Sequence, residues 1–311
     1  MHVETVTSAQ NPKIKTLLSL QEKARLRKEM GLFVVEGRRE LEHCVNAGFE
    51  IDTVFYCPEI FELALTAKTE SGGSLFSDNS LTLSGPSHCK QWAPPSYVAE
   101  GGTDSWRTAA DQTTKMLERA RQIVNVPAEL YNKIAYRGGT EGIIAEVKAK
   151  VQTLDSLELS ENPLVVILES VEKPGNLGAV LRSADAAGAD AVIICDPLTD
   201  LYNPNLIRAS IGAAFTVQTV CCSSEDAINW LKANGIKLYT AQLQDSSWYY
   251  DTDMKGATAI AIGTEATGLT DIWREAADAH IKIPMLGQLD SLNASVSAAI
   301  LLFEAVRQRN A

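Results

Sequence analysis

From about residue 162 to its end, the chain alternates short apolar segments with segments of helical periodicity. The short segments are apolar throughout, which is typical of strands buried on both faces. Strands that alternate with helices of this length predict an α/β domain whose parallel sheet is covered by helices on both faces. The predicted strands are 164–169, 191–195, 215–220, 236–241, 257–263 and 280–284. The predicted helices cover about 177–187, 204–213, 224–234, 268–278 and 293–308.

The first half of the chain has a different composition. Residues 67–105 are rich in Ser, Gly and Pro and are predicted to form an irregular insertion. Because 311 residues suffice for two domains, we predict a smaller α/β domain at 1–155 and the parallel-sheet domain at 160–311. The elements predicted for the smaller domain are a basic helix at 14–30, a strand at 31–37, a helix ending at Gly48, a strand at 51–57, a helix near 109–122 and a strand at 142–149.

Composition disfavours several classes of protein. The first twenty residues are mixed and polar, unlike a secretory signal, and no apolar run approaches the length of a membrane span. The six cysteines form no CxxC pair and the four histidines are scattered. We therefore expect reduced thiols, no metal site and a cytoplasmic location. The net charge of −11 argues against a protein that coats nucleic acid indiscriminately.

A basic segment near the N-terminus departs from this acidic average. Between residues 11 and 28, six basic side chains stand against the single acid Glu22. Such a cluster fits a nucleic-acid contact, and on charge alone a solvated helix face explains it equally well. The basic residues are Lys13, Lys15, Lys23, Arg25, Arg27 and Lys28.

The segment EKPGNLGAVLRSADAAG at 172–188 follows a predicted strand and begins a predicted helix. A dinucleotide-binding turn occupies such a position, and Asp196 lies where a ribose-binding acid would follow. The segment lacks the closely spaced GxG pair of that turn, which disfavours a nicotinamide or flavin enzyme. Asn176 is a favoured helix cap, and Arg182 could simply extend along the surface or pair with Asp185. The glycines are predicted to form a tight turn that directs Asn176 and Arg182 towards a substrate.

Two further turns near the end of the chain contain polar residues. AIAIGTEATGLTD places Gly263 and Glu265 between a strand and a helix, and IPMLGQLDSLNASVSAAILLFEAV places Ser291 and Asn293 before an apolar helix. Each polar residue could merely cap the helix that follows it. All three turns nevertheless follow the carboxyl ends of predicted parallel strands, where open α/β sheets bind their ligands. We therefore expect the three turns to form one site.

These three segments resemble the three motifs of the SpoU (TrmH) family in the SPOUT superfamily of RNA methyltransferases. The motifs read NLGAVLRSA, IGTEATGL and IPMLGQLDSLNASVSAAI, and they occur in the family's order and at its separations. NPNLIRASIGAAF at 203–215 resembles the segment between motifs, and the N-terminal half resembles a substrate-binding domain akin to ribosomal protein L30e. The resemblance implies S-adenosylmethionine-dependent methylation of a ribose 2′-hydroxyl in RNA, by a homodimer whose C-terminal domain contains a trefoil knot.

The resemblance also assigns roles to particular residues. Its implied catalytic residues are Asn176, Arg182, Glu265, Ser291 and Asn293. Its implied cofactor-binding residues are Ala241, Ile262, Gly263, Glu265, Ile283, Met285, Leu292 and Asn293. The candidate RNA contacts are the six basic residues named above together with Arg38. The family places Arg182 beside the hydroxyl, sometimes as a base. Because arginine stays protonated in proteins, we favour stabilisation of the developing alkoxide and leave the two roles open.

The substrate is less constrained than the chemistry. The insertion at 67–105 has no counterpart in the family pattern. A separate basic N-terminal domain favours ribosomal RNA over transfer RNA, because it suits recognition of a structured hairpin by its shape and phosphates. A non-catalytic RNA-binding or ribosome-assembly factor on the same scaffold is the remaining alternative, and the intact motifs argue against it.

Overall fold

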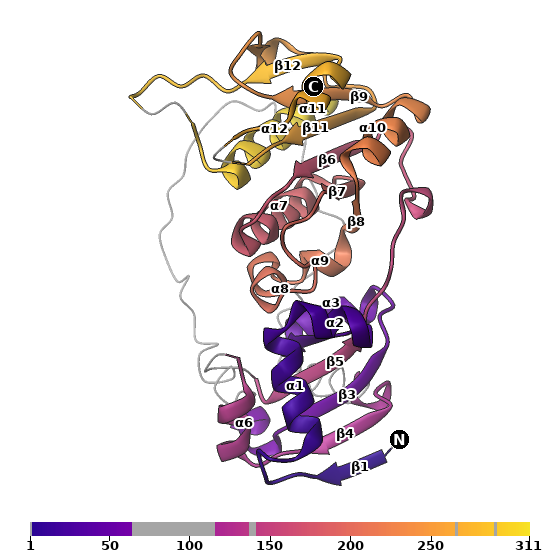
Figure 1. Ribbon diagram of the computed structural model, residues 1–311, viewed down its shortest axis with the longest axis vertical. Coiled ribbons are helices and arrows are strands. Elements are labelled where there is room, and N and C mark those ends of the chain that lie inside the picture. Colours follow the sequence, from indigo (N-terminus) through magenta and orange to yellow (C-terminus); the bar gives the residue numbers. More distant parts are fainter. Residues whose placement is uncertain (1, 64–115, 137–140, 265–266, 289–290) are drawn as a thin grey trace, which may run out of the picture.

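The computed structural model describes residues 2–63, 116–136, 141–264, 267–288 and 291–311. The described residues form two sheets, one in each half of the chain, and the two halves lie one after the other along the long axis of the molecule (Figure 1). The predicted insertion at 67–105 and the first half of the predicted helix at 109–122 lie outside the described residues. The domain boundaries at 155 and 160 stay predictions. A short 3₁₀ turn at Leu154–Ser156 lies in the segment that connects the two sheets along the chain.

The C-terminal half confirms the predicted parallel α/β architecture. Seven strands pair in the order β10-β12-β9-β11-β6-β7-β8, and every pairing is parallel. The central strands are buried at every position, which explains their uninterrupted apolar sequence. The strands are β6 Leu164–Glu169, β7 Ala191–Cys195, β8 Gln218–Cys222, β9 Lys237–Ala241, β10 Ser247–Trp248, β11 Thr258–Ile262 and β12 Ala279–Lys282.

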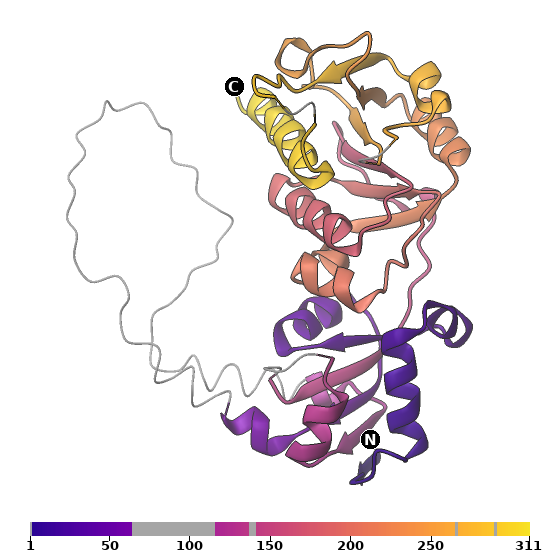
Figure 2. The ribbon, with the colours of Figure 1, turned by 60° about the vertical axis from the view of Figure 1, so that its left-hand side comes forward.

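Helices cover both faces of this sheet. One apolar core holds residues of α7, α8, α9 and α12 against one face, and another holds α10 and α11 against the other. Figure 2 shows α12 lying along one side of the C-terminal half. The helices are α7 Pro174–Ala187, α8 Pro204–Ser210, α9 Ala213–Thr216, α10 Ser224–Ala233, α11 Asp271–Ala276 and α12 Ala294–Arg309, with a 3₁₀ turn at Tyr249–Asp251. The trefoil knot stays a prediction from the resemblance.

Three predictions for this half were wrong in detail. The strand expected at 215–220 begins as the short helix α9, because Phe215 packs into the core of the N-terminal half, and β8 follows it. The helix expected from 268 begins at Asp271, since Gly268 pairs with Thr264 in the preceding loop. The two-residue strand β10 carries no periodicity and was not predicted.

The N-terminal half is a five-stranded mixed sheet in the order β1-β4-β3-β5-β2. Helices α1 and α6 cover one face, and α3 lies on the other. The expected helix at 14–30 is two helices that meet at Lys23, whose extended backbone (φ −108°, ψ 104°) breaks it. The elements β1, β4 and α6 were missed, and β4 begins at Gln122, where the helix expected near 109–122 was to end. The bounds are β1 His2–Thr5, β2 Leu32–Glu36, β3 Ile51–Tyr56, β4 Gln122–Asn125, β5 Ile143–Lys148, α1 Pro12–Glu22, α2 Ala24–Met30, α3 Arg38–Asn46 and α6 Ala128–Ile134.

A cluster of aromatic side chains joins the two halves. Phe33 of β2 stacks on Tyr202, with ring centroids 4.2 Å apart, and Phe49 packs edge-on against Phe215. The Tyr202 hydroxyl donates a hydrogen bond to the carbonyl of Lys150 at 2.8 Å. Because these side chains form one core with Ile207 of α8, the two halves are held in a fixed arrangement.

One buried carboxyl in the N-terminal sheet makes stability depend on pH. Glu146 on β5 is 6% exposed, and its Oε1 has no partner within the described part of the chain. Burial, together with the nearby charge of Asp52, raises the pKa of Glu146 to about 7. Between the unfolded pKa near 4.5 and the folded pKa, the folded state retains a proton that the unfolded state loses. The contribution of Glu146 to the free energy of unfolding therefore falls as the pH rises from about 4.5 to about 7.

We expect Glu146→Gln to remove this dependence. The variant should be more stable than the wild type at pH 8, by up to about 3 kcal/mol, and similar to it at pH 4.5. Urea unfolding at the two pH values measures the difference. Glu22→Gln, at an exposed position of the same half, is the matched control. An equal pH dependence in Glu146→Gln and the wild type would contradict the assignment.

Candidate active site

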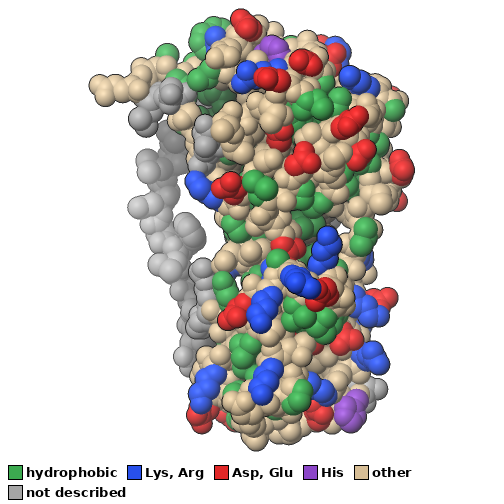
Figure 3. Space-filling model, in the orientation of Figure 1, with side chains coloured by type: hydrophobic (Ala, Val, Ile, Leu, Met, Phe, Trp, Pro, Cys, Tyr) green, Lys and Arg blue, Asp and Glu red, His purple; other side chains and the backbone are tan. Residues whose placement is uncertain are grey.

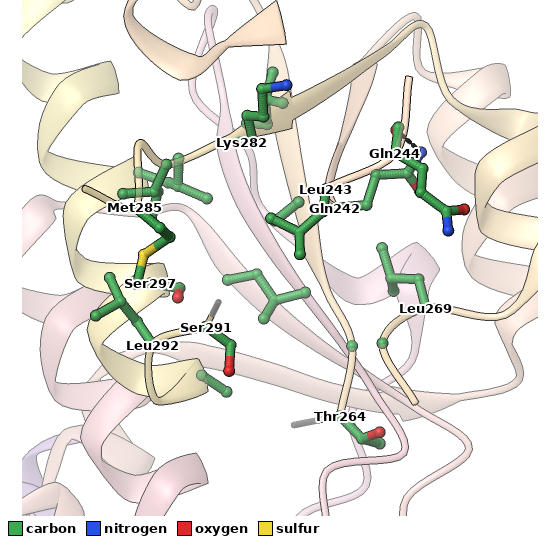
Figure 4. Close-up of a pocket in the computed structure, with 18 of the residues that line it drawn as sticks. Gln242, Leu243, Gln244, Thr264, Leu269, Lys282, Met285, Ser291, Leu292 and Ser297 are labelled. Atoms are coloured by element: carbon green, nitrogen blue, oxygen red, sulfur yellow. Dashed lines mark hydrogen bonds between the residues drawn. The ribbon is translucent and has the colours of Figure 1, made fainter. Parts of the chain in front are cut away.

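A cavity of about 430 Å³ lies at the carboxyl ends of β9, β11 and β12, beside the start of α12 (Figure 4). Six of the residues predicted to bind a cofactor line it. Those six are Ala241, Ile262, Gly263, Ile283, Met285 and Leu292. Glu265, also predicted for this site, lies outside the described residues. Motif residues that were predicted neither as cofactor contacts nor as catalytic residues also line it, namely Thr264, Gly268, Leu269, Ala294 and Ser297. Lining from outside the motifs comes from Gln242, Leu243, Gln244, Arg274, Ile281, Lys282 and Leu301.

The loop after β11 requires glycine at position 263. Thr264 and Gly268 exchange two backbone hydrogen bonds of 3.2 and 3.0 Å, which folds the loop back on its own start. A Cβ on Gly263 would overlap the backbone of Gly268 and Leu269. Gly263 therefore lets this loop close against the wall of the cavity.

Asn293 connects two segments that are far apart in the sequence. Its Oδ1 accepts hydrogen bonds from the Ser295 backbone N–H (3.0 Å) and the Ser295 hydroxyl (2.6 Å), so Asn293 caps α12. Its Nδ2 donates to Oδ1 of Asn176 at 3.1 Å. The first and third motifs thus meet, as predicted, next to Ser291 and Leu292 on the cavity wall.

The glycines of the first motif have a different role from the one predicted. Helix α7 begins at Pro174, so Gly175, Asn176 and Gly178 lie inside its first turns, and Lys173 occupies the cap position. The expected tight turn is wrong, and the alternative explanation of Asn176 as a helix cap does not apply. A Cβ on Gly178 would lie 2.6 Å from Cβ of Ala209 and 2.8 Å from the carbonyl oxygen of Leu206. Gly178 therefore allows α8 to pack closely against α7.

Arg182 lies one turn beyond Gly178 on α7. Its side chain is exposed, does not line the cavity, and makes no hydrogen bond or ion pair within the described structure. The alternative of a pairing with Asp185 is not realised; Asp185 instead accepts a 2.5 Å hydrogen bond from Thr216 of α9. The guanidinium of Arg182 is thus available to a group outside this chain.

The predicted RNA-contact residues divide into exposed and engaged side chains. Figure 3 shows Lys and Arg side chains gathered over α1 and α2, where Lys15, Lys23, Arg25 and Lys28 are exposed. Of these four, Arg25 also pairs with Glu29, its Nε lying 2.6 Å from Oε1. Lys13 pairs with Glu4 at 2.5 Å, and Arg38 lies 3.9 Å from Glu141.

Arg27 was wrongly predicted as an RNA contact. It is 4% exposed, and its Nε donates to Oδ2 of Asp200 at 2.5 Å. Nη1 donates to the carbonyls of Leu20 and Gln21 at 2.6 and 3.2 Å. Its charge is therefore used in the contact between the two halves.

Gln242, Gln244, Arg274 and Lys282 are polar residues of the cavity that sequence reasoning missed. Oε1 of Gln242 and Nε of Arg274 are buried and have no hydrogen-bond partner among the described residues. Gln242 follows a predicted strand directly, so its position at a carboxyl end was a usable signal. Arg274 stands within a predicted helix, and the sequence offers no sign that it faces a cavity.

Within the described ranges, no group of three His, Cys, Asp or Glu side chains is placed to hold a metal ion, and none of the helices there could span a membrane. The fold and the cavity define an α/β protein that binds a small molecule at the carboxyl edge of a parallel sheet. The model of the SpoU rRNA Methylase family matches residues 163–303, and that of the MRM3-like substrate binding domain matches residues 11–79.

Two relatives illustrate the match in sequence. A 23S rRNA (uridine(2479)-2′-O)-methyltransferase of Streptomyces viridochromogenes is 32% identical over 197 residues, covering 61% of this chain and 69% of that protein. The 23S rRNA (guanosine-2′-O-)-methyltransferase RlmB of Photobacterium profundum is 41% identical over 175 residues, covering 54% and 71%. The chain belongs to the SpoU family of RNA methyltransferases, as its three motifs predicted.

Solved structures extend the likeness to the whole chain. The crystal structure of an RNA 2′-O ribose methyltransferase matches with a TM-score of 0.71 and 32% identity, covering 99% of this chain and all of that one. An AdoMet-bound rRNA methyltransferase from Sinorhizobium meliloti matches with a TM-score of 0.76 and 25% identity, covering 98% of each. Both halves of the chain therefore have counterparts in one architecture.

Proposed function

We propose that this protein transfers the methyl group of S-adenosylmethionine to a ribose 2′-hydroxyl of ribosomal RNA. The observation that carries the proposal is the hydrogen bond between Asn176 and Asn293, which brings the first motif to the cavity formed by the other two. The activities named for the relatives, all on 23S rRNA, support the choice of substrate.

The cavity suits this cofactor in size and chemistry. A volume of about 430 Å³ is in the range of small-molecule sites. Ile262, Ile283 and Leu292 offer apolar surface for an adenine ring. Gln242, Arg274 and Lys282 add polar side chains to the same wall. When bound, the cofactor supplies a methyl group activated by its positive sulfur.

The chain's own residues align and activate the hydroxyl. A ribose hydroxyl is a weak nucleophile at neutral pH, so negative charge that develops on its oxygen needs stabilisation. The planar guanidinium of Arg182 has the donor geometry to fit both this oxygen and an adjacent phosphate. Asn176 and Asn293 fix the start of α7 relative to the cavity, and Ser291 lies on the wall. A role for Glu265 in the loop after β11 stays part of the proposal.

We propose a homodimer as the working form. Arg182 does not line the cavity of its own chain. In a homodimer, Arg182 of one copy could instead act on a ribose bound at the cavity of the other copy. Large apolar side chains are exposed along and beside α12: Val296 is 46% exposed, Phe303 47% and Leu286 97%. An apolar helix face of this kind is a typical interface. A cytoplasmic location goes with this proposal.

The N-terminal half is proposed to bind the RNA. The basic side chains exposed on α1 and α2 form a patch on an otherwise acidic protein, and phosphate contacts are made by such patches. The name of the matching family model, a substrate binding domain, supports the same role. Lys15, Lys23, Arg25 and Lys28 are the proposed contacts.

The test is a map of 2′-O-methylated riboses in cells with and without this protein. We expect a site in the large ribosomal RNA to lose its methyl group in the deletion strain and to regain it with the wild-type gene. Loss confined to transfer RNA would replace the proposed substrate. Unchanged methylation of all RNA would favour a non-catalytic RNA-binding protein instead.

A further inference from the structure

Two aromatic side chains lie exposed next to each other at the edge of the C-terminal sheet. Trp248 ends the edge strand β10 and is 40% exposed, and Tyr250 in the following 3₁₀ turn is 47% exposed. Their rings are nearly parallel, with 20° between the planes and 6.4 Å between the centroids. Large apolar rings that gather on a folded surface are a typical sign of an interaction site.

The turn that carries these two rings is anchored to the core. Tyr249 lies between them in the sequence and packs inward against the core of the C-terminal half. Gln308 of α12 accepts a hydrogen bond from the backbone N–H of Met254 at 2.8 Å and donates one to the carbonyl of Thr252 at 2.9 Å. The two exposed rings are therefore held in place before a ligand arrives, so binding to them requires little ordering of the protein.

A lysine connects the aromatic pair to the cavity. Lys282 of β12 lies opposite Trp248 of β10, and its Nζ is 4.8 Å from the centroid of a Trp248 ring. This cation–π contact holds the indole against β12. Lys282 also lines the cavity, and Figure 4 shows it at the edge of the lining. The aromatic pair therefore lies on the surface directly beside the cavity.

We propose that an unpaired base of the substrate RNA stacks on Trp248 and Tyr250 while a nearby ribose of the same strand lies at the cavity. This inference rests on the proposed function. Every base has a flat π-face, and proteins that bind single-stranded RNA stack unpaired bases on exposed aromatic rings. A base held beside the cavity positions the strand that carries the target ribose, which favours transfer by proximity and orientation.

The charges and the size of the surface favour a base over two alternatives. Asp251 and Asp253 follow the rings in the sequence, are exposed, and repel phosphate groups. The contact is therefore with the face of a base rather than with the sugar–phosphate backbone. A stable protein interface buries about 800 Å² on each partner, which is more than two half-exposed rings provide.

Binding of short RNA to the full chain, followed by tryptophan fluorescence, tests the contact. The probe is a single strand of about ten nucleotides, compared with its duplex and with an abasic strand of the same length. The wild type should bind the single strand most tightly, and its fluorescence should be quenched. Trp248→Leu should bind about 5- to 150-fold more weakly and lose the quenching, because one stacked base is lost. Tyr250→Leu should also weaken binding.

Three measurements separate stacking from charge effects and from misfolding. Trp248→Phe keeps a flat ring, so it should lose the quenching but bind within about fivefold of the wild type. Trp248→Leu should leave the slope of log binding constant against log salt concentration unchanged, since no phosphate contact is lost. Ile272→Ala removes a similarly exposed (42%) apolar side chain from α11 and should change neither affinity nor quenching.

Several outcomes would overturn the inference. These are a wild type that binds the abasic strand as tightly as the single strand, a Trp248→Leu variant with wild-type affinity, and equal weakening by Ile272→Ala. A changed oligomeric state of Trp248→Leu in analytical ultracentrifugation would assign the rings to a contact between copies and overturn it as well. In each case, methyl transfer to ribosomal RNA by the wild type leaves the proposed function standing. Absence of that transfer removes the proposed function, whatever the rings bind.

Discussion

Arg182→Ala is expected to lower the rate of methyl transfer to RNA at least about 100-fold, the usual cost of removing a group that stabilises developing charge. Binding of S-adenosylhomocysteine should stay within twofold of the wild type, because Arg182 does not line the cavity. Transfer of a tritiated methyl group under single-turnover conditions measures the first quantity, and calorimetry measures the second. This separation distinguishes a residue that acts on the substrate from one that holds the cofactor.

Two further variants sharpen the result. Arg182→Lys keeps the charge but loses the planar donor group, so it should restore only part of the rate. Lys232→Ala removes an exposed positive charge from α10, on the opposite face of the sheet, and should leave the rate unchanged. Wild-type turnover by Arg182→Ala would remove this residue from the mechanism.

Arg27→Ala is expected to lower the free energy of unfolding by about 3 kcal/mol, because it leaves Asp200 and two backbone carbonyls without their buried partner. Arg27 and Asp200 come from different halves of the chain, so the variant loses an interaction that holds the two halves together. Chemical denaturation measures the change. A change below about 0.5 kcal/mol would show that the ion pair contributes no net stability.

The neighbouring Lys23 provides the matched control for Arg27. Its side chain is exposed at the junction of α1 and α2, so Lys23→Ala should leave stability within about 0.5 kcal/mol. If Lys23 contacts a phosphate, the same change should make the plot of log binding constant against log salt concentration less steep, by nearly one released counterion. Arg27→Ala should leave that dependence unchanged, since its guanidinium is buried.

The sequence specified the long elements of the C-terminal half well. Strands β6, β7 and β11 are buried on both faces, and that condition alone requires the uninterrupted apolar runs from which they were predicted. Short edge strands such as β1 and β10 lack this requirement, because none of their residues is buried. Their pairing depends on neighbours distant in sequence, so no local pattern indicated them.

The site shows the same division. The sequence by itself determined the family, the three motifs and six residues of the cavity wall, because the motifs follow strands whose carboxyl ends must meet at one edge of a parallel sheet. Only the tertiary structure decided that Arg27 is buried against Asp200, that Gly178 serves helix packing, and that Arg274 faces the cavity. Each of these depends on which surface a side chain meets after folding, and local periodicity carries no information about that neighbour.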